Sequence, residues 1–175
     1  MTRTVRNPLL LTAAGLALLA AGGAGWGGWS WYTAAHDEAA AHSVTRDEVL
    51  AAGEQAVQNM NTLDHRDVAA GLRAWQQSST GELLKQLTDG RDRFERQIRE
   101  AKTVTTAKVL SGAVTELDTR AGRASVMVAL RVTVTPPKGK PAAKESRMLG
   151  ELTRTPGGWK LSALGQAPVG TTATG

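Results

Sequence analysis

Three histidines are the first candidates for proton transfer or metal binding, because histidine is the only side chain whose ordinary pKa lies near neutral pH. His36 and His42 lie in a polar stretch just after a long uncharged run, where we interpret them as solvated residues rather than as a metal pair. A metal site needs three or four converging ligands. His65 lies between Asp64 and Asp67, whose carboxylates we expect to cap a helix. We therefore predict no catalytic residue and no metal ligand.

Other reaction types are disfavoured by what the sequence lacks. It contains no cysteine, which excludes disulfides, thiolate metal sites and cysteine nucleophiles. It has no serine nucleophile elbow and no phosphate-binding glycine loop. Ketosteroid isomerase combines an acidic base with tyrosine and protonated aspartate donors, whereas the only tyrosine here is Tyr32. We predict that the protein is not an enzyme and needs no cofactor, although Glu116 or Asp118 could still enter a cavity.

The charge balance argues against a nucleic-acid partner. The chain has 21 Lys and Arg residues against 16 Asp and Glu residues, a formal charge of +5. Two of the basic residues precede the uncharged run, which leaves +3 for the rest of the chain. Binding nucleic acid would require a clustered basic stripe with stacking aromatic residues, but only Trp75, Phe94 and Trp159 are aromatic beyond position 32. We predict no nucleic-acid partner.

The first expected element is a membrane anchor, the uncharged run from Pro8 to Ala35. A bilayer core needs about 20 apolar residues, so this run predicts one transmembrane helix. Arg3 and Arg6 precede it, which favours a cytoplasmic N-terminus and an extracytoplasmic C-terminal domain. Four aromatic residues near its far end predict a membrane-interface belt: Trp26, Trp29, Trp31 and Tyr32. A cleaved signal peptide is the alternative, because Leu9–Leu19 also fits an apolar signal core.

Helical patterns follow a juxtamembrane linker predicted over 36–44. Thr45 and Glu48 fit a capping box, and an apolar stripe then recurs at helical spacing. A shorter helix is expected after Asp67, with Val68, Leu72 and Trp75 on one face. Ser79 and Glu82 fit a second capping box that would open one long helix ending near residue 101. Three acid–base pairs four residues apart predict an exposed face on it: Asp89–Arg93, Asp92–Arg96 and Glu95–Arg99.

Beyond Lys102 the apolar period changes from helical to alternating, which predicts strands over 108–117, 124–134, 146–155 and 159–164. An exposed loop is expected at 136–141 and a turn at 156–158. Together the patterns predict an α+β fold: an N-terminal transmembrane helix, then a cone-like domain of two to three helices packed on a curved four-stranded antiparallel sheet. The domain is expected over 45–166, with a flexible tail at 167–175.

The order of these parts resembles the actinobacterial Mce-associated membrane proteins. The resemblance lies in the N-terminal span and in three segments: WQQSSTGELLKQL (Trp75–Leu87), ASVMVALRVTV (Ala124–Val134) and TPGGWKLSALG (Thr155–Gly165). It implies an extracytoplasmic domain similar to the nuclear transport factor 2-like cone and a role as an accessory subunit of an Mce-type lipid importer. It transfers no functional residue to this sequence.

We therefore expect a non-enzymatic, single-pass membrane accessory protein that scaffolds or stabilises an Mce-type lipid transport complex. Its partners would be the lipid bilayer and other membrane proteins of that transporter, and a homo-oligomer is compatible with the sequence. One alternative is an assembly component of a type IV secretion or conjugation-like complex. Another is a membrane-tethered small-ligand binder or enzyme of the cone fold, whose apolar pocket would be lined by Trp75, Phe94, Val126, Val128, Leu130 and Trp159.

Overall fold

The structure, a computed structural model, describes residues 42–167 of the 175-residue chain. The described residues from Thr45 onward belong to one compact unit. No helix within the described range is long and apolar enough to cross a membrane. The predicted span, its interface belt and the alternative signal peptide all lie outside the described residues.

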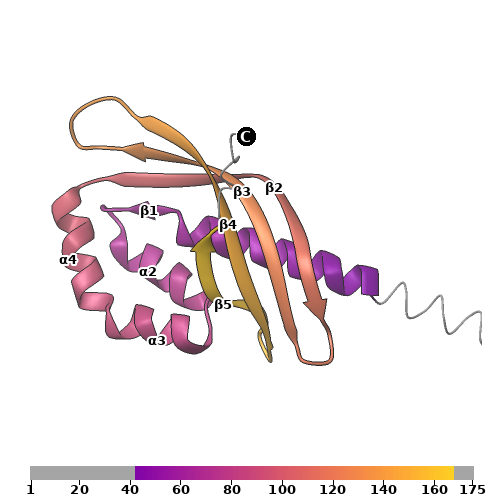
Figure 1. Cartoon of the computed structure of the whole chain (residues 1–175). Helices are drawn as coiled ribbons and strands as arrows, with labels where there is room; N and C mark the ends of the chain where they lie inside the picture. Colours follow the sequence, from indigo (N-terminus) through magenta and orange to yellow (C-terminus); the bar gives the residue numbers. More distant parts are fainter. Residues whose placement is uncertain (1–41, 168–175) are drawn as a thin grey trace, which may run out of the picture. The chain divides into compact units, whose positions relative to one another are not determined.

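Five antiparallel strands form one sheet in the order β1-β2-β3-β4-β5 (Figure 1). Their bounds are β1 Leu63–Asp64, β2 Val104–Asp118, β3 Arg123–Thr135, β4 Ala142–Thr155 and β5 Gly158–Gln166. Each strand pairs with the next along the chain. Short connections join β2 to β5, as expected for runs of alternating hydrophobicity, whereas helices lie between β1 and β2. The predicted α+β class is confirmed, with one two-residue strand more than expected.

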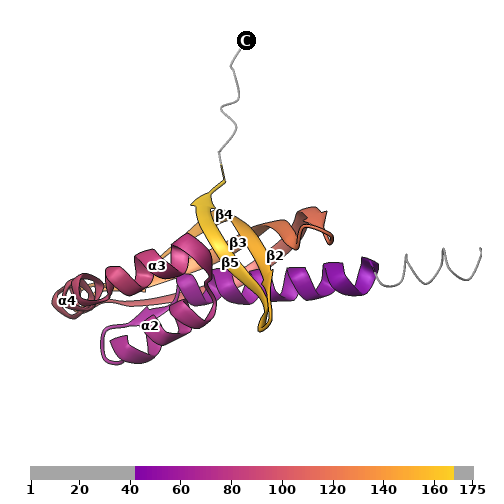
Figure 2. The same ribbon diagram turned by 90° about the horizontal axis from the view of Figure 1, so that it is seen from below.

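The helices lie on one side of the sheet (Figures 1 and 2). The first is described over residues 42–60, and α2 (Val68–Gln77), α3 (Gly81–Asp89) and α4 (Arg91–Ala101) follow before β2 begins. Since the first helix carries its apolar residues on one stripe, it can bury that stripe against the sheet while its other face stays solvated.

The core forms where the first helix crosses the centre of the sheet. Val126 and Leu130 on β3 are fully buried against the helical side, as are Val49 and Val57 of the first helix. Gly53 lets the helix approach closely, because a Cβ built there would lie 2.8 Å from Cγ2 of Val126. The apolar face predicted for residues 124–134 is therefore the core face of the sheet.

The junction before α2 is capped as the sequence predicts. The side chain of Asp67 accepts a hydrogen bond from the backbone N–H of Ala70 at 3.2 Å. The carboxylate of Asp64 accepts one from the backbone N–H of Arg66 at 2.8 Å. These bonds satisfy amide groups that a helix start leaves without intrahelical partners.

Two predicted helix starts are wrong. The first helix is already formed at residue 42, so Thr45 lies inside it rather than at its N-cap. A capping box marks a helix start only where the residues before it are not helical, and residues 42–44 are helical. Ser79 does not cap α3 either, because its buried hydroxyl donates to the carbonyl oxygen of Trp75 at 2.7 Å. Thr80 occupies the N-cap position instead.

The single long helix predicted after residue 81 is also wrong, because Gly90 divides it into α3 and α4. The ring of Phe94 occupies the space of a side chain at Gly90, where a Cβ would lie 2.7 Å from Cε2 of that ring. Glycine is also a weak helix former. Of the three predicted acid–base pairs, only Glu95–Arg99 forms an ion pair within these described helices, at 2.7 Å.

The predicted strands all form, but β2 and β4 begin earlier than expected. Pairing between β3 and β4 continues to Val134 and Ala142, four residues before the predicted start of β4 at 146. Polar residues at the start of β4 conceal its strand character because they lack a clear alternation. As a result, the β3–β4 hairpin extends past the end of β5 (Figure 1).

Candidate binding surfaces

The six residues predicted to line an apolar pocket lie in two separate places. Val126, Val128, Leu130 and Trp159 belong to the buried core. Trp75 and Phe94 form an edge-to-face pair on the helices, with ring centroids 6.5 Å apart. The indole N–H of Trp75 donates to the carbonyl oxygen of Asn59 at 2.8 Å, which fixes its ring. The structure thus brings four of the six together as packed core.

The indole nitrogen of Trp159 is the one buried side-chain polar atom without a hydrogen-bond partner within residues 42–167. Trp159 borders a shallow hollow of about 190 Å³ beside the first helix, lined also by Gln55, Gln77 and Lys160. A buried donor without an acceptor costs stability of about 1–3 kcal/mol.

An apolar trough of about 320 Å³ lies at the end of the sheet where β3 and β4 run beyond the helices. Its floor is Val132, Val134 and Met148, which point to the same side of the sheet as the core. Asn61 and Gln166 close its sides, and Lys144 stands at its rim. Sequence reasoning missed the trough, although Val132 and Val134 continue the core alternation past the last helix-covered position.

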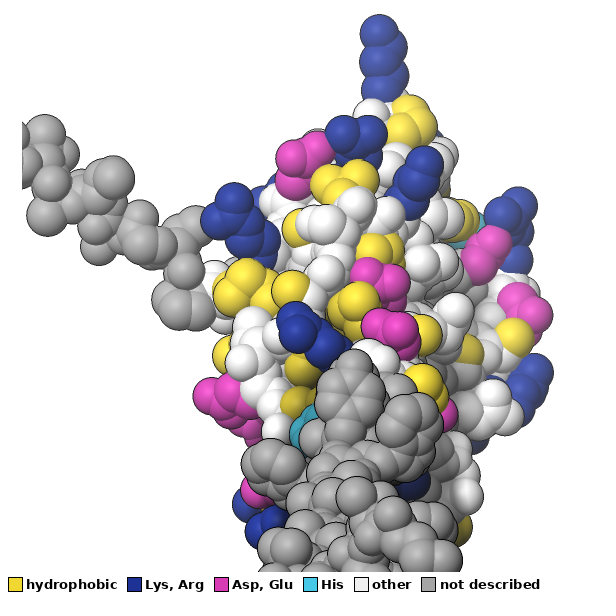
Figure 3. Space-filling model, turned by 90° about the vertical axis from the view of Figure 1, so that its right-hand side faces the viewer, with side chains coloured by type: hydrophobic (Ala, Val, Ile, Leu, Met, Phe, Trp, Pro, Cys, Tyr) yellow, Lys and Arg dark blue, Asp and Glu magenta, His cyan; other side chains and the backbone are white. Residues whose placement is uncertain are grey.

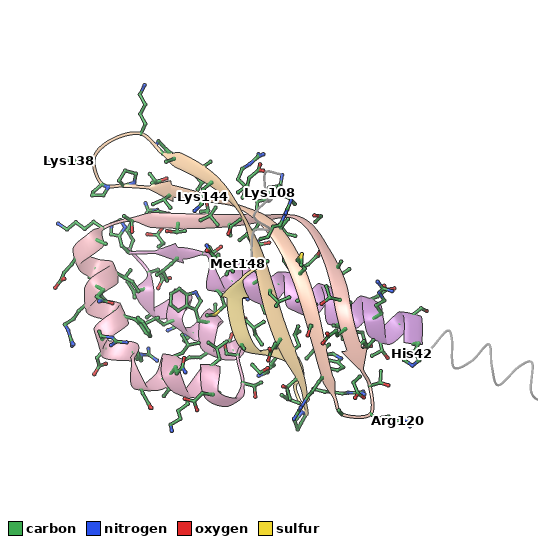
Figure 4. The ribbon with its side chains drawn as sticks, viewed as in Figure 1. His42, Lys108, Arg120, Lys138, Lys144 and Met148 are labelled. Atoms are coloured by element: carbon green, nitrogen blue, oxygen red, sulfur yellow. The ribbon has the colours of Figure 1, made fainter. Side chains whose placement is uncertain are left out.

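A second hollow of about 460 Å³ lies against the opposite side of β4. Leu110 and Ala129 line it from β2 and β3, and Arg147 lines it from β4. Figure 4 labels three lysines at this end of the sheet, Lys108, Lys138 and Lys144, with Met148 further along β4.

The outer face of the sheet, opposite the helices, carries an apolar row across the four strands β2 to β5. Ala113, Met127, Leu149 and Gly165 lie side by side through the strand register. Leu110, at an irregularity in β2, lies next to this row. Leu110, Met127 and Leu149 are exposed by 44%, 38% and 36%, which is high for side chains of this type.

Charged residues of opposite sign flank this apolar row. Toward the β3–β4 hairpin lie Lys108, Arg131 and Arg147, where Arg131 pairs with Glu145 at 2.7 Å. Toward the β2–β3 turn lie the acidic residues Glu116, Asp118 and Glu151, with the single basic residue Arg123 opposite Asp118. Figure 3 shows the side of the molecule to the right of Figure 1, where hydrophobic side chains alternate with charged ones of both signs. We call the row with its two charged flanks the outer-face patch.

The described residues include no group of three or more His, Cys, Asp or Glu residues that could hold a metal ion. Glu116 and Asp118 border an open hollow of about 520 Å³, but Arg123, Thr153 and Ser162 line it too, so these acids lie at a polar surface rather than in an apolar cavity.

The strongest electrostatic effect within the described range is local and structural. The Arg66 guanidinium donates to both carboxylate oxygens of Asp64, at 2.6 Å in the shorter ion-pair contact. These hydrogen bonds lower the pKa of Asp64 from 3.8 to about 2. The Nδ1 of His65 donates a hydrogen bond to the carbonyl oxygen of Thr103 at 3.2 Å, and so anchors the junction to β2. The shift reflects capping and pairing at a helix junction.

The chain matches a known family over nearly its whole length. Residues 9–168 fit the family described as uncharacterized protein Rv1363c/MT1408-like. The protein belongs to this family. The family is a mycobacterial one, which agrees with the actinobacterial part of the sequence resemblance. No curated protein matches the chain.

Solved structures share the fold of the domain. An IcmL-like type IV secretion system protein from Legionella pneumophila has a TM-score of 0.57 at 11% identity and covers 72% of this chain and 94% of its own. The periplasmic domain of DotI has a TM-score of 0.56 at 19% identity, with coverages of 69% and 94%. CagV, a VirB8 homologue of Helicobacter pylori, has a TM-score of 0.52 at 13% identity, with coverages of 70% and 98%. These likenesses establish the fold: helices packed on a curved antiparallel sheet.

Proposed function

We propose that this protein is a non-enzymatic assembly subunit of a membrane complex of the type IV secretion or conjugation kind. A single N-terminal span would hold it in the membrane, with the N-terminus in the cytoplasm and the C-terminal domain outside it. Two similar folds support the choice of complex, since one belongs to a type IV secretion system protein and another to a VirB8 homologue. The long uncharged run supports the placement.

The outer-face patch is the observation that carries the proposal. Within residues 42–167 helices cover only one side of the sheet, so the apolar row at Met127 and Leu149 faces outward there. Exposed apolar side chains bordered by charge are typical of surfaces that bind other proteins.

The charges of the patch favour a second copy of the chain as the occupant. A two-fold axis through the apolar row would place Arg147 of one copy near Glu151 of the other, and the reverse. Both copies would bury Met127 and Leu149 at the centre. The opposite signs on the two flanks thus make the patch complementary to itself.

Disulfide crosslinking tests this arrangement cleanly, because the chain has no cysteine of its own. Full-length Met127→Cys protein in mild detergent should form a covalent dimer on oxidation, since Met127 lies near the proposed axis. Gln97→Cys is the matched control, because Gln97 is exposed on α4 and far along the chain from the patch. It should form no covalent dimer under the same conditions.

Charge reversal tests the orientation. Arg147→Glu alone should weaken self-association, and adding Glu151→Arg should restore part of it, because the reversed pair again brings opposite charges together. A chain that stays monomeric, with equal crosslinking at positions 127 and 97, would contradict the self-association surface.

A second candidate is the accessory subunit of an Mce-type lipid transporter. The resemblance in the sequence supports it, and so does the apolar trough at Val132, Val134 and Met148, which offers a surface for a hydrocarbon chain. Affinity purification from native membranes separates the two candidates. Secretion or conjugation proteins in the eluate support the first, whereas Mce or permease subunits support the second.

A ligand-binding role, the remaining alternative, would place small apolar molecules in the trough. Native mass spectrometry of the purified full-length chain would detect a retained lipid or other small molecule. Val134→Glu should abolish such retention, because it places a charge in the floor of the trough.

A further inference from the structure

One edge of the sheet is left without a neighbour at the start of β4. On one side β4 pairs with β3 from Ala142 onward. On the other side it pairs with β5 only from Met148, opposite Gln166. The last contact on that side is a hydrogen bond of 2.9 Å from the N–H of Ala167 to the carbonyl oxygen of Arg147. Residues 142–146 therefore have a strand on one side only within the described part of the chain (Figure 1).

The backbone groups at this edge can be assigned from the alternation of an antiparallel ladder. In such a ladder the N–H and C=O of one residue point to the same neighbour, and those of the next residue to the other. Because the carbonyl of Arg147 points to the β5 side, the N–H and C=O of Ala143 and Glu145 point that way too. Both residues are exposed. An open row of this kind is a template for an added strand.

The two hollows at this end of the sheet lie on either side of the same edge. The apolar trough and the second hollow share Lys144, Ser146 and Gln166 in their linings. An added strand would send alternate side chains to opposite faces. Side chains on the core side would enter the trough at Val132 and Met148, and the others would lie near Arg147.

Charge decides which kind of strand fits. Lys138 and Lys140 lie in the loop of the hairpin, Lys144 lies on the trough side of the edge, and Arg147 lies on its outer side. The one acid, Glu145, already pairs with Arg131. A second copy of this edge would bring basic residues against basic residues, which disfavours pairing between copies. An acidic strand would instead gain from these charges.

We propose that the edge of β4 over Ala142–Ser146 binds an extended segment of a partner protein in which acidic and apolar residues alternate. The segment runs antiparallel to β4, in the position that β5 leaves open. Its apolar side chains enter the trough, and its acidic side chains lie on the outer side next to Arg147, opposite Ala143 and Glu145, the latter already paired with Arg131. This inference goes beyond the self-association proposed above and does not depend on it, because a monomeric chain retains the edge.

A synthetic probe tests the proposal on the full-length chain in detergent. The probe is a fluorescently labelled acetyl-(Glu-Val)3-amide, and its binding is followed by fluorescence anisotropy. A (Lys-Val)3 peptide is the charge control. Two N-methylated forms are the backbone controls, because N-methylation removes amide donors without altering the side chains.

The N-methylated forms distinguish strand addition from simple charge attraction. When the probe pairs antiparallel to β4, the probe residues that form backbone hydrogen bonds with Ala143 and Glu145 have their side chains on the outer face of the sheet. In the probe these residues are the glutamates. Methylating the three glutamate nitrogens should therefore weaken binding about thirtyfold, from the loss of the two hydrogen bonds that reach the carbonyl oxygens of Ala143 and Glu145. Methylating the valine nitrogens, which face solvent, should leave binding nearly unchanged.

Protein variants and hydrogen exchange complete the test. Ala143→Pro removes one edge N–H without touching the β3 ladder and should weaken binding about fivefold, whereas Ala143→Val keeps that N–H and should bind as the unaltered chain does. If the proline variant fails to fold, exchange in the unaltered chain still decides: the probe should protect the amides of Ala143 and Glu145.

Several results would overturn the proposal. These are equal binding of the two N-methylated probes, equal binding of (Lys-Val)3, or no saturable binding of (Glu-Val)3. Protection of Ala143 and Glu145 before any probe is added would overturn it too. If removal of residues 168–175 abolished that protection, the occupant would be the chain's own tail; if dilution abolished it, the occupant would be a second copy.

Discussion

Replacing Gly53 by alanine should destabilise the domain, although alanine is the better helix former. In an exposed helix this change would stabilise by about 1 kcal/mol. Here the new Cβ would lie 2.8, 3.1 and 3.4 Å from Cγ2, Cγ1 and Cβ of Val126. Val126 is fully buried and β-branched, so it has no alternative rotamer with free space.

The magnitude follows from the two opposing terms. Overpacking a well-packed core costs about 1–3 kcal/mol, which exceeds the gain in helix propensity, so the net loss should be about 1 kcal/mol. Urea unfolding followed by far-UV circular dichroism measures it. Gly165→Ala is the control, because a Cβ there meets nothing within 4 Å, and it should change the free energy of unfolding by less than about 0.5 kcal/mol.

A double-mutant cycle identifies the contact itself. Val126→Ala removes the two methyl groups that the new Cβ would strike, so Gly53→Ala should be stabilising in the Val126→Ala background. If Gly53→Ala stabilises the unaltered chain as well, the first helix does not cross β3 at this point, and the packing argument fails.

Three further outcomes can be checked by similar unfolding experiments. Leu130→Ala should lower the free energy of unfolding by roughly 3 kcal/mol, because Leu130 is fully buried at the centre of the sheet. Arg131→Ala should lower the free energy of unfolding by less than about 1 kcal/mol at low salt and by nearly nothing at high salt, because both side chains of the Arg131–Glu145 ion pair are exposed. Asp64→Asn should lower the free energy of unfolding at neutral pH. Pairing with Arg66 lowers the folded-state pKa of Asp64 to about 2, so the difference in unfolding free energy between the variant and the unaltered chain should shrink from about pH 4 toward pH 2.

Alternation of apolar residues predicted the sheet well because it reflects burial directly. Val126, Val128 and Leu130 repeat every second position, and each is fully buried on the helical side of β3. The same logic fails at the start of β4, where Ala142–Glu145 lie at an exposed end of the sheet. A strand without a buried face leaves no periodic signal, so its edge could not be found in the sequence.

Capping patterns predicted helix junctions less well, because a cap depends on what precedes it and on burial. Asp67 caps α2 as expected, since the chain turns just before it. Ser79 has the same kind of pattern, but an isolated bridge to Leu161 on β5 draws it inward, and its hydroxyl bonds to the carbonyl of Trp75. The long-range contact outweighs the local signal there.

The candidate surfaces arise from a mismatch between the sheet and its covering helices. A filled core accounts for most of the residues that sequence reasoning placed around a pocket, because Val126, Val128, Leu130 and Trp159 pack on the first helix and on one another. The strands β3 and β4 nevertheless continue to Val134 and Ala142, where helical cover has ended and β5 has already stopped. Apolar side chains and backbone hydrogen-bonding groups are then exposed together at one end of the domain. Catalysis would need convergent titratable groups, whereas this combination needs only an extended chain to complete it, so the β3–β4 extension favours binding to a partner protein over reaction chemistry.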